Sequence, residues 1–346
     1  MELLTGLWLG MPVWVWLGFL AVVLAILAFD LGVLHRQAHE IELRESLWLS
    51  AFYIGLGLLW AGAVWWIYAR YGGSEALDPR IAALPDAGSR AAEAVKLYLT
   101  GYLLEKALAM DNVFVIAMIF SYFAVPRIYQ HRVLFWGILG VILLRGLMIG
   151  LGAALVLNMA WILYVFAGVL LLTGLKMFKD ADALPSIEDN PVLRFLKERL
   201  RLTSELHGQR FFVRQPAVPG GPALLHATPL FLCLVLVELA DVVFAIDSVP
   251  AIFAITPDPF IVYTSNIFAI LGLRALYFAL AAMVHRFHYL KYALALVLVF
   301  IGLKILVGHG LLGLQVPAML SLGVTVGLLL GGVAVSLWAS RGKAGA

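Results

Sequence analysis

Three carboxylates stand within ten residues of one long apolar run, at Glu238, Asp241 and Asp247. A charged side chain at the centre of a bilayer costs about 2.5–3.5 kcal/mol even on the lenient insertion scale. These acids must therefore face a protein interior or a watery cavity rather than lipid. Because crowded carboxylates repel one another unless a cation or shared protons lie between them, they are the first candidates for a functional site.

A second acidic segment repeats this pattern earlier in the chain. In both segments an acid precedes an aspartate by six positions, and Asn or Ser follows the aspartate at once. Two shorter matches follow in the same order, residues 143–147 with 272–276 and residues 173–176 with 301–304. An internal duplication is therefore indicated, although a duplicated scaffold without transport activity would leave the same record. The matched polar pairs are Glu105 with Asp241, Asp111 with Asp247, and Asn112 with Ser248.

The two segments offer oxygen ligands and contain no histidine or cysteine. Carboxylate, amide and hydroxyl oxygens suit Mn²⁺, Ca²⁺ or Mg²⁺ better than Zn²⁺ or Cu⁺. The thioether of Met110 would favour a softer metal, but a lone methionine is more often a packing residue. The candidate metal ligands are Glu105, Asp111, Asn112, Glu238, Asp241, Asp247 and Ser248.

Helix geometry limits how these acids can converge. At about 100° per residue, Glu238 and Asp241 share a helix face, whereas Asp247 lies on the side opposite Glu238. Pro250 cannot donate to the carbonyl of Ile246, and its ring presses on that turn. The sequence therefore predicts a helix that is kinked or unwound between Ile246 and Pro250, which would turn Asp247 toward the site. An ordinary proline kink, with Asp247 paired to a base, is the alternative.

Basic residues in the apolar segments nearly match the acids in number. They could form interhelical ion pairs that hold the helices together, or they could partner carboxylates at a gate. Arg145 and Arg274 stand at matched positions of the two copies and fit either role. The candidate ion-pair or gating residues are Asp30, Lys106, Arg145, Lys176, Arg274 and Lys304.

Composition decides what kind of element must position these residues. Hydrophobic residues make up 63% of the 346 and charged residues only 13%, and the mean hydropathy is +0.98. This composition predicts an all-α polytopic membrane protein, because a helix of about 20 apolar residues crosses a bilayer. Nine candidate spans fit, at residues 10–33, 46–69, 94–124, 131–156, 159–178, 227–255, 260–284, 290–308 and 315–339.

The duplicated unit contains three of these spans. Because three is an odd number, the second copy must cross the membrane in the opposite sense. Inverted repeats of this kind are a recurrent transporter design, with the substrate site near the midplane where the copies meet. The predicted organisation is an N-terminal two-helix segment (1–93), a first three-helix repeat (94–178), a cytoplasmic linker (179–226), a second, inverted three-helix repeat (227–308) and a C-terminal helix (309–346).

The distribution of basic residues predicts the orientation. Lys and Arg concentrate in the loops on one side, and the positive-inside rule places those loops in the cytoplasm. The N-terminus is then outside and the C-terminus is cytoplasmic, in a multi-pass protein of the inner (plasma) membrane.

Other classes of protein find little support in the sequence. Cys233 is the single cysteine, so neither a disulfide framework nor a Cys-based metal site is expected. A Gly-rich phosphate loop, a Ser-His-Asp order and a cytoplasmic nucleotide-binding domain are all missing from the sequence, which argues against an enzyme or an ATP-driven pump. We expect no prosthetic group and no nucleic-acid partner. The expected partners are a divalent metal ion and the lipid bilayer, and the sequence identifies no protein partner.

Three segments, residues 29–36, 105–112 and 241–251, closely resemble the signature segments of the TerC/Alx family of integral membrane proteins. The resemblance extends over about residues 10–340. It implies manganese efflux and homeostasis within the broader LysE-type exporter group, and the family's names point to tellurium resistance and an alkaline response. It also implies that the matched acids bind the ion together with Asn112 and Ser248.

Two further positions matter to this resemblance. Asp30 is also a matched position of the family. Ala109 stands where the family usually has Ser, so a hydroxyl is lost near the first acidic segment. That loss could alter ligation or hydration at the site, but it removes no carboxylate.

The leading hypothesis is a secondary transporter that moves Mn²⁺ from cytoplasm to exterior through a carboxylate-lined midplane site by alternating access. Ca²⁺ is the alternative cargo. Proton countertransport fits this scheme, because bound metal competes with protons for carboxylates. The rival hypothesis is a membrane scaffold or assembly partner in metal or tellurium stress, with the acids as structural ion pairs. A channel is a third possibility, disfavoured because the repeat and the kink suit alternating access better than a pore.

Overall fold

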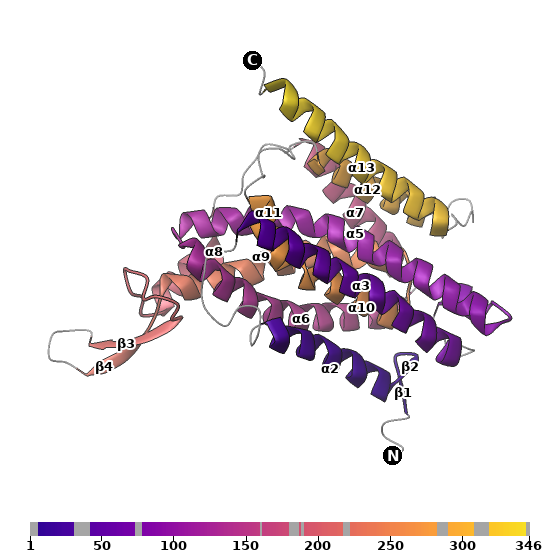
Figure 1. Ribbon diagram of the computed structural model, residues 1–346, viewed down its shortest axis with the longest axis horizontal. Helices are drawn as coiled ribbons and strands as arrows, with labels where there is room; N and C mark the ends of the chain where they lie inside the picture. Colours follow the sequence, from indigo (N-terminus) through magenta and orange to yellow (C-terminus); the bar gives the residue numbers. More distant parts are fainter. Residues whose placement is uncertain are drawn as a thin grey trace.

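The structure is a computed structural model of the whole chain, and it is predominantly helical (Figure 1). Within a few helices the backbone is described but individual side chains, among them those of Asp111 and Arg274, are not. The residues described are 6–30, 42–72, 78–159, 161–179, 187, 190–216, 222–281, 290–307 and 318–343.

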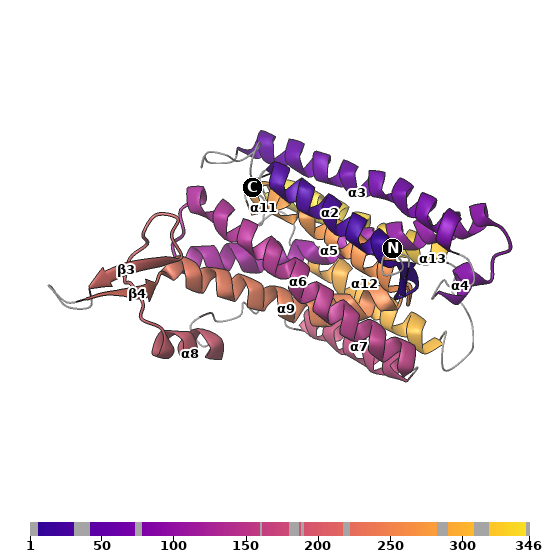
Figure 2. The same ribbon diagram turned by 90° about the horizontal axis from the view of Figure 1, so that it is seen from below.

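Long helices run along the length of the molecule and form one elongated bundle (Figures 1 and 2). The helices are α2 (Val13–Phe29), α3 (Leu43–Tyr71), α4 (Pro79–Ala82), α5 (Ala87–Tyr122), α6 (Arg127–Asn158), α7 (Ile162–Lys179), α8 (Pro191–Arg199), α9 (Pro229–Phe253), α10 (Pro259–Leu271), α11 (Leu273–Ala281), α12 (Leu290–Leu306) and α13 (Ala318–Lys343).

Two small antiparallel pairs of strands accompany the helices. β1 (Leu7–Trp8) pairs with β2 (Met11–Pro12) just before α2. β3 (Phe212–Pro216) pairs with β4 (Ala223–Ala227), and this second hairpin projects beside α8 from one end of the bundle (Figure 2). We use the hairpin to name the two ends of the bundle, the hairpin end and the opposite end, where α4 lies.

Polar residues in the connecting segments fix where several helices begin. Asp86 accepts a hydrogen bond from the backbone N–H of Ser89 over 2.8 Å and starts α5. Asp258 does the same for Phe260 over 3.0 Å at the start of α10, where Pro259 occupies the first helical position. Side-chain caps of this kind satisfy backbone N–H groups that have no partner inside the helix. The central helices are therefore anchored by acids outside the apolar segments.

The outer surface of the bundle is strongly apolar. The side chains of Leu59, Leu143, Leu172 and Trp338 are 74%, 74%, 71% and 78% exposed. Such a surface is unsuited to water and is what a lipid environment requires. Among the described residues, three helices are long and apolar enough to cross a membrane, α3, α6 and α9, and shorter apolar helices lie at Val13–Phe29, Ile162–Phe178, Pro259–Leu271 and Gly323–Ser336.

α5 lies at the centre of the bundle. It packs against α3, α9 and α10, while α6 packs against α9 and α7 packs against α12. These contacts bring the two acidic segments, on α5 and α9, into direct contact. α13 lies against α12 and α5 at one side of the molecule (Figure 1).

The contact between α7 and α12 is reciprocal. A Cβ placed on Gly174 would lie 2.8 Å from Val299 Cγ2, and a Cβ placed on Gly302 would lie 2.8 Å from Leu171 Cγ. Each would also meet a backbone carbonyl of the other helix, at 2.9 Å and 3.0 Å. The contacted residues lie three and seven positions before the glycine of their own helix. The two helices are therefore antiparallel, and the glycines allow their backbones to approach closely.

Each of the nine sequence ranges predicted as spans contains a helix, and the range 260–284 contains two. α6 ends at Asn158, between the predicted spans 131–156 and 159–178. Of the predicted kink or unwinding between Ile246 and Pro250, the unwinding is wrong, because α9 continues as a helix through Pro250 to Phe253; the kink stays a prediction. The discontinuity lies instead at Gly272, between α10 and α11. That all nine ranges cross a membrane, and as inverted repeats, stays a prediction.

Candidate functional site

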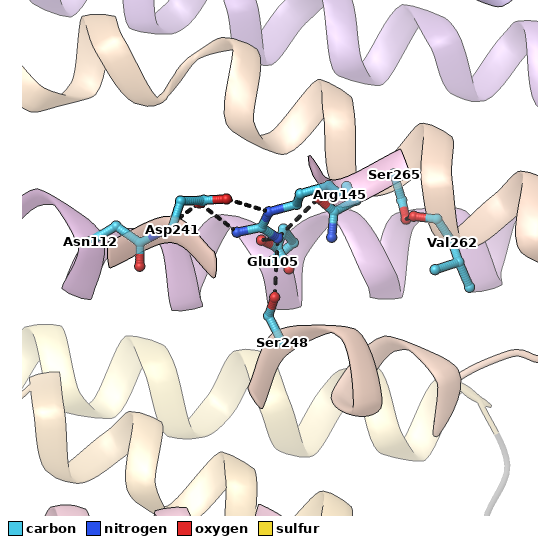
Figure 3. A network of polar contacts seen from close by, with 8 residues as sticks. Glu105, Asn112, Arg145, Asp241, Ser248, Val262 and Ser265 are labelled. Atoms are coloured by element: carbon cyan, nitrogen blue, oxygen red, sulfur yellow. Dashed lines mark hydrogen bonds and ion pairs between the residues drawn. The ribbon is translucent and has the colours of Figure 1, made fainter. Parts of the chain in front are cut away.

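The candidate site is centred on Arg145 of α6, whose guanidinium contacts residues of three other helices (Figure 3). Its Nε and Nη2 donate to the two carboxylate oxygens of Asp241 over 3.2 Å and 3.0 Å. Its Nη1 donates to Glu105 of α5, and also to Ser248 Oγ and Asn266 Oδ1, each over 3.0 Å. One cation thus joins α5, α6, α9 and α10.

This network is deeply buried. Arg145 and Glu105 are each 1% exposed and Asp241 is 6% exposed. Two carboxylates share one guanidinium, so the three side chains carry a formal charge of −1. A buried ion pair is tolerated when both groups are paired and hydrogen-bonded, and here one negative charge is left without a partner in the trio.

Spacing along the helices explains why these residues meet. Glu105 and Asn112 are seven positions apart, as are Asp241 and Ser248. Seven residues are close to two turns of helix, so each pair shares one face. The helices cross with Asn112 Nδ2 donating to Asp241 over 3.5 Å, while Glu105 and Ser248 both accept from Arg145 Nη1.

A central cavity of about 170 Å³ adjoins this network. Asp247 lines it and accepts a hydrogen bond from Thr173 Oγ1 over 2.8 Å. A single water needs roughly 10–15 Å³, so the central cavity has room for a cation with water ligands. Its polar and thioether lining is Glu105, Asn112, Arg145, Thr173, Met177, Asp247 and Ser248.

Among the described residues, two buried oxygens of the central cavity lining have no hydrogen-bond partner. These are Glu105 Oε2 and Asn112 Oδ1, on side chains that are 1% and 3% exposed. A buried acceptor left unsatisfied costs about 1–3 kcal/mol. Both are hard oxygen donors of the kind that Mn²⁺, Ca²⁺ and Mg²⁺ prefer, so the residues present fit a divalent cation.

The carboxylates do not, however, form a ready-made cage. Within the described part of the chain, no group of three or more His, Cys, Asp or Glu side chains is placed to hold a metal ion. The guanidinium of Arg145 separates Glu105 from Asp241. The arginine therefore fills the space between these two carboxylates.

Other predicted ligands lie elsewhere or outside the description. Glu238 packs its carboxylate against Gly140 of α6, where an added Cβ would meet it, and its Oε2 is buried with no hydrogen-bond partner in the described ranges. The side chain of Asp111 lies outside the described residues. Of the seven predicted ligands, four line the central cavity, namely Glu105, Asn112, Asp247 and Ser248.

The predicted ion-pair residues fall into different environments. Lys106 is buried and donates to the carbonyl of Ala269 over 3.1 Å, near the discontinuity at Gly272. Asp30 is buried at the end of α2. Lys176 is exposed, Lys304 is half-buried, and the Arg274 side chain lies outside the described residues.

Two further cavities lie toward the hairpin end. A vestibule of about 510 Å³ adjoins the C-terminal end of α5, with Ser121, Arg127 and Gln130 in its lining. A narrow cavity of about 30 Å³ is lined by Asn112 and Asp241 together with apolar residues. Asn112 lines both the narrow and the central cavity, so the narrow cavity lies directly beside the polar site.

A second polar cluster closes the opposite end. Arg80 forms an ion pair with Asp78 over 2.6 Å and donates to the carbonyl of Ile255, and Thr256 donates to Asp78 over 2.6 Å. Burial raises the pKa of the neighbouring Asp258 to about 6, and the charge of Asp78 adds to this shift. We call Asp78, Arg80, Thr256 and Asp258 the outer cluster.

Sequence reasoning missed several residues of the site. Thr173 and Met177 contribute to the central cavity from α7, and Asn266 accepts from Arg145. Thr173 stands in one of the repeated segments, and Asn266 is a lone amide in an apolar span, so both carried a signal. Met177 carried none.

A helical chain with an apolar outer surface and a buried charged centre is a multi-pass integral membrane protein. Comparison with known families makes this specific. Residues 90–344 match the integral membrane protein TerC family, and the chain belongs to that family.

Named relatives cover nearly the whole chain. A protein of Escherichia coli (strain K12) named putative membrane-bound redox modulator Alx is 45% identical over 330 residues, 95% of each chain. Its namesake in Salmonella typhi is 44% identical over 333 residues, 96% of each chain. An uncharacterized membrane protein of Myxococcus xanthus is 43% identical over 326 residues, 94% of this chain and 92% of the relative. No solved structure matches this chain.

Proposed function

We propose that this chain is a secondary transporter that exports a divalent metal ion, with Mn²⁺ as the cargo. The observation that carries the proposal is the central cavity, where a buried carboxylate oxygen and a buried amide oxygen have no partner among the described side chains and backbone. Acids on α5 and α9 meet there with a formal excess of negative charge over the single guanidinium that joins them. A divalent cation would satisfy both the orphaned oxygens and the excess charge.

Alternating access is supported by contacts that obey the sequence repeat. Asn112 and Asp241 of one contact are matched in the repeat to Ser248 and Glu105. The Asn112–Asp241 contact therefore has its counterpart in the proximity of Ser248 to Glu105, which both accept from Arg145. Exchanging the matched positions of the two copies likewise turns the Gly174 contact on α12 into the Gly302 contact on α7. Antiparallel helices with exchangeable contacts are what two inverted repeats of three spans require, and such repeats rock about a shared midplane site in other transporters.

The cavities support a form of the transporter that is open toward the hairpin end. The vestibule and the narrow cavity lie on that side of the site, whereas the outer cluster ties α4 to the turn between α9 and α10 at the other end. With the linker in the cytoplasm, the N-terminus outside and the chain in the inner membrane, this is the cytoplasm-facing form. Metal would then enter through the vestibule and leave past the outer cluster.

Proton countertransport follows from the same side chains. A carboxylate that binds a divalent ion must lose its proton, so metal and protons compete for one site. Release of metal to the exterior would accompany protonation of Glu105, Asp241 or Asp247, and protons would return to the cytoplasm with the empty site.

Reconstituted protein tests the proposal directly. Proteoliposomes loaded with a manganese-sensitive dye should take up Mn²⁺, and Glu105→Gln and Asp247→Asn should each lower the initial rate at least tenfold. Glu205→Gln, on an exposed side chain of the linker, is the matched control and should leave the rate unchanged. Wild-type rates in both site variants would refute the proposal.

A membrane scaffold remains the competing function, and one observation favours it. Arg145 fastens four helices, as a purely structural ion pair would. A scaffold predicts that Glu105→Gln lowers the melting temperature by the same amount whether or not Mn²⁺ is present. A transporter predicts that Mn²⁺ raises the melting temperature of the wild type and not that of the variant.

The Escherichia coli relative is named a redox modulator, but this chain does not contain the pair of thiols that a disulfide-based redox function would need. Cys233 is its single cysteine and is fully buried. A disulfide switch within one chain needs two cysteines. We therefore base the proposed function on the carboxylates.

A further inference from the structure

The guanidinium of Arg145 lies where a metal ion would bridge the two acidic segments. It bonds both oxygens of Asp241 and one oxygen of Glu105, and all three side chains are less than a tenth exposed (Figure 3). The second oxygen of Glu105 has no hydrogen-bond partner within the part of the chain that the structure describes. An ion that recruits both acids must therefore take oxygens that the arginine now holds.

We propose that Arg145 is a tethered counter-cation, which competes with the transported divalent ion for Glu105 and Asp241. The inference rests on the proposed function and adds a role for this residue in setting metal affinity. Binding of the metal displaces the guanidinium from the carboxylates, and release of the metal lets it return.

Charge explains why the two cations exclude each other. With Arg145 in place the trio carries −1, since two carboxylates face one guanidinium. A divalent ion alone on the same two carboxylates would make them neutral. Both cations together would bring like charges into contact at a buried site, which is unfavourable. The carboxylates therefore exchange one cation for the other rather than holding both.

Competition between the guanidinium and the metal would also help the transporter to return after it has released the metal. Two bare carboxylates would be costly to carry through the membrane interior. The guanidinium offsets one of these charges, so fewer protons are needed to make the empty site neutral. An always-charged, bidentate side chain suits this role, because it holds both oxygens of Asp241 and keeps its charge when the metal leaves.

Neutral acceptors are placed to hold the arginine. Ser248 Oγ and Asn266 Oδ1 each accept from Nη1 over 3.0 Å. Asn266 does not line the central cavity, so its contact with Arg145 stabilises the guanidinium rather than a bound ion. Weakening the Asn266–Arg145 contact should therefore make the guanidinium a weaker competitor for the carboxylates. The oxygens that would bind the metal ion stay in place.

Metal affinity of the purified protein tests the inference. Mn²⁺ binding to detergent-solubilised protein, measured by calorimetry and by the electron paramagnetic resonance signal of free Mn²⁺, should be at least tenfold tighter in Arg145→Gln than in the wild type. Arg145→Lys keeps the positive charge and should bind within about threefold of the wild type. Net transport by Arg145→Gln should be slower, because the metal is held more tightly. Unchanged or weaker binding by Arg145→Gln would overturn the inference.

A second variant keeps the test decisive if Arg145→Gln does not fold. Asn266→Ala leaves every charge in place and removes one acceptor of the guanidinium, so it should bind Mn²⁺ severalfold more tightly than the wild type. If Asn266 instead supports the metal, the affinity falls and the inference is wrong. Failure of the wild type to bind or transport Mn²⁺ would overturn the proposed function as well, whereas normal wild-type transport with no gain of affinity in either variant would overturn this inference alone.

Discussion

The antiparallel contact between α7 and α12 makes a quantitative prediction for two glycines. Gly174→Ala and Gly302→Ala would each place a Cβ 2.8 Å from a side-chain carbon of the facing helix and within 3.0 Å of a backbone carbonyl. A backbone atom cannot move aside as a flexible side chain can, so the helices must separate. Overpacking of this kind costs about 1–3 kcal/mol.

The intrinsic effect of alanine acts in the opposite direction. Replacing a helical glycine by alanine stabilises a helix by about 0.5–1 kcal/mol. Gly168 lies on the same helix, α7, and no described atom would lie within 4 Å of a Cβ added there. Gly168→Ala should therefore be stabilised by about 0.5–1 kcal/mol. The difference between each contact variant and this control isolates the collision, at about 1–3 kcal/mol.

Unfolding in mixed detergent micelles, followed by circular dichroism as the denaturing detergent is increased, measures these differences. The reciprocity of the contact requires Gly174→Ala and Gly302→Ala to be destabilised by similar amounts. If Gly174→Ala is as stable as Gly168→Ala, the close approach of α7 and α12 is wrong. A loss in only one of the two contact variants would contradict the reciprocal packing from which the inverted repeat is argued.

Three further predictions concern single side chains. Because burial raises the pKa of Asp258 to about 6 from an unfolded value near 4, the folded protein holds this proton more tightly, so stability falls as pH rises from about 4 to 6. Asp258→Asn keeps the capping oxygen and should flatten that slope in melting temperatures measured across this range; an unchanged slope would exclude Asp258 as its source. Thr173→Val removes the hydroxyl that donates to Asp247, worth about 1 kcal/mol, and should change Mn²⁺ affinity severalfold without loss of folding; an affinity equal to that of the wild type would remove Thr173 from the site. Gly140→Ala would meet the carboxylate of Glu238, the flexible end of a side chain that can move aside, so it should lose less stability in detergent unfolding than Gly174→Ala; a loss as large would mean that the Glu238 carboxylate is held in place.

The acidic segments were predictable because their chemistry conflicts with their surroundings. Glu105 and Asp241 stand in apolar runs, and a charge in such a run must find a buried partner. The structure places them in one network, as the repeat in the sequence indicated. The positions of the helices could likewise be predicted from the lengths of the apolar runs. Asp86 and Asp258 mark the starts of α5 and α10, because their carboxylates accept hydrogen bonds from the first backbone N–H groups of those helices.

What the sequence could not supply was the choice among partners. Arg145 could have been paired with any acid in the bundle, and only the packing of α6 against α9 selects Asp241. Pro250 predicted a kinked or unwound segment, and α9 continues as a helix through it, so one missing N–H does not unwind the helix here. The break occurs at Gly272, where a side chain would meet Lys106 Nζ.

The bidentate hydrogen bonding of Arg145 to Asp241 also affects how metal binding by the protein would depend on pH. A guanidinium stays charged throughout the physiological range, unlike an imidazole or an acidic group. Raising the pH removes protons from carboxylates, so protons no longer compete with the metal for these oxygens. The arginine keeps its charge and still competes with the metal. Under the proposed function, the affinity of the site for metal would therefore rise with pH only until the carboxylates have lost their protons, and would then level off at a value that this side chain sets.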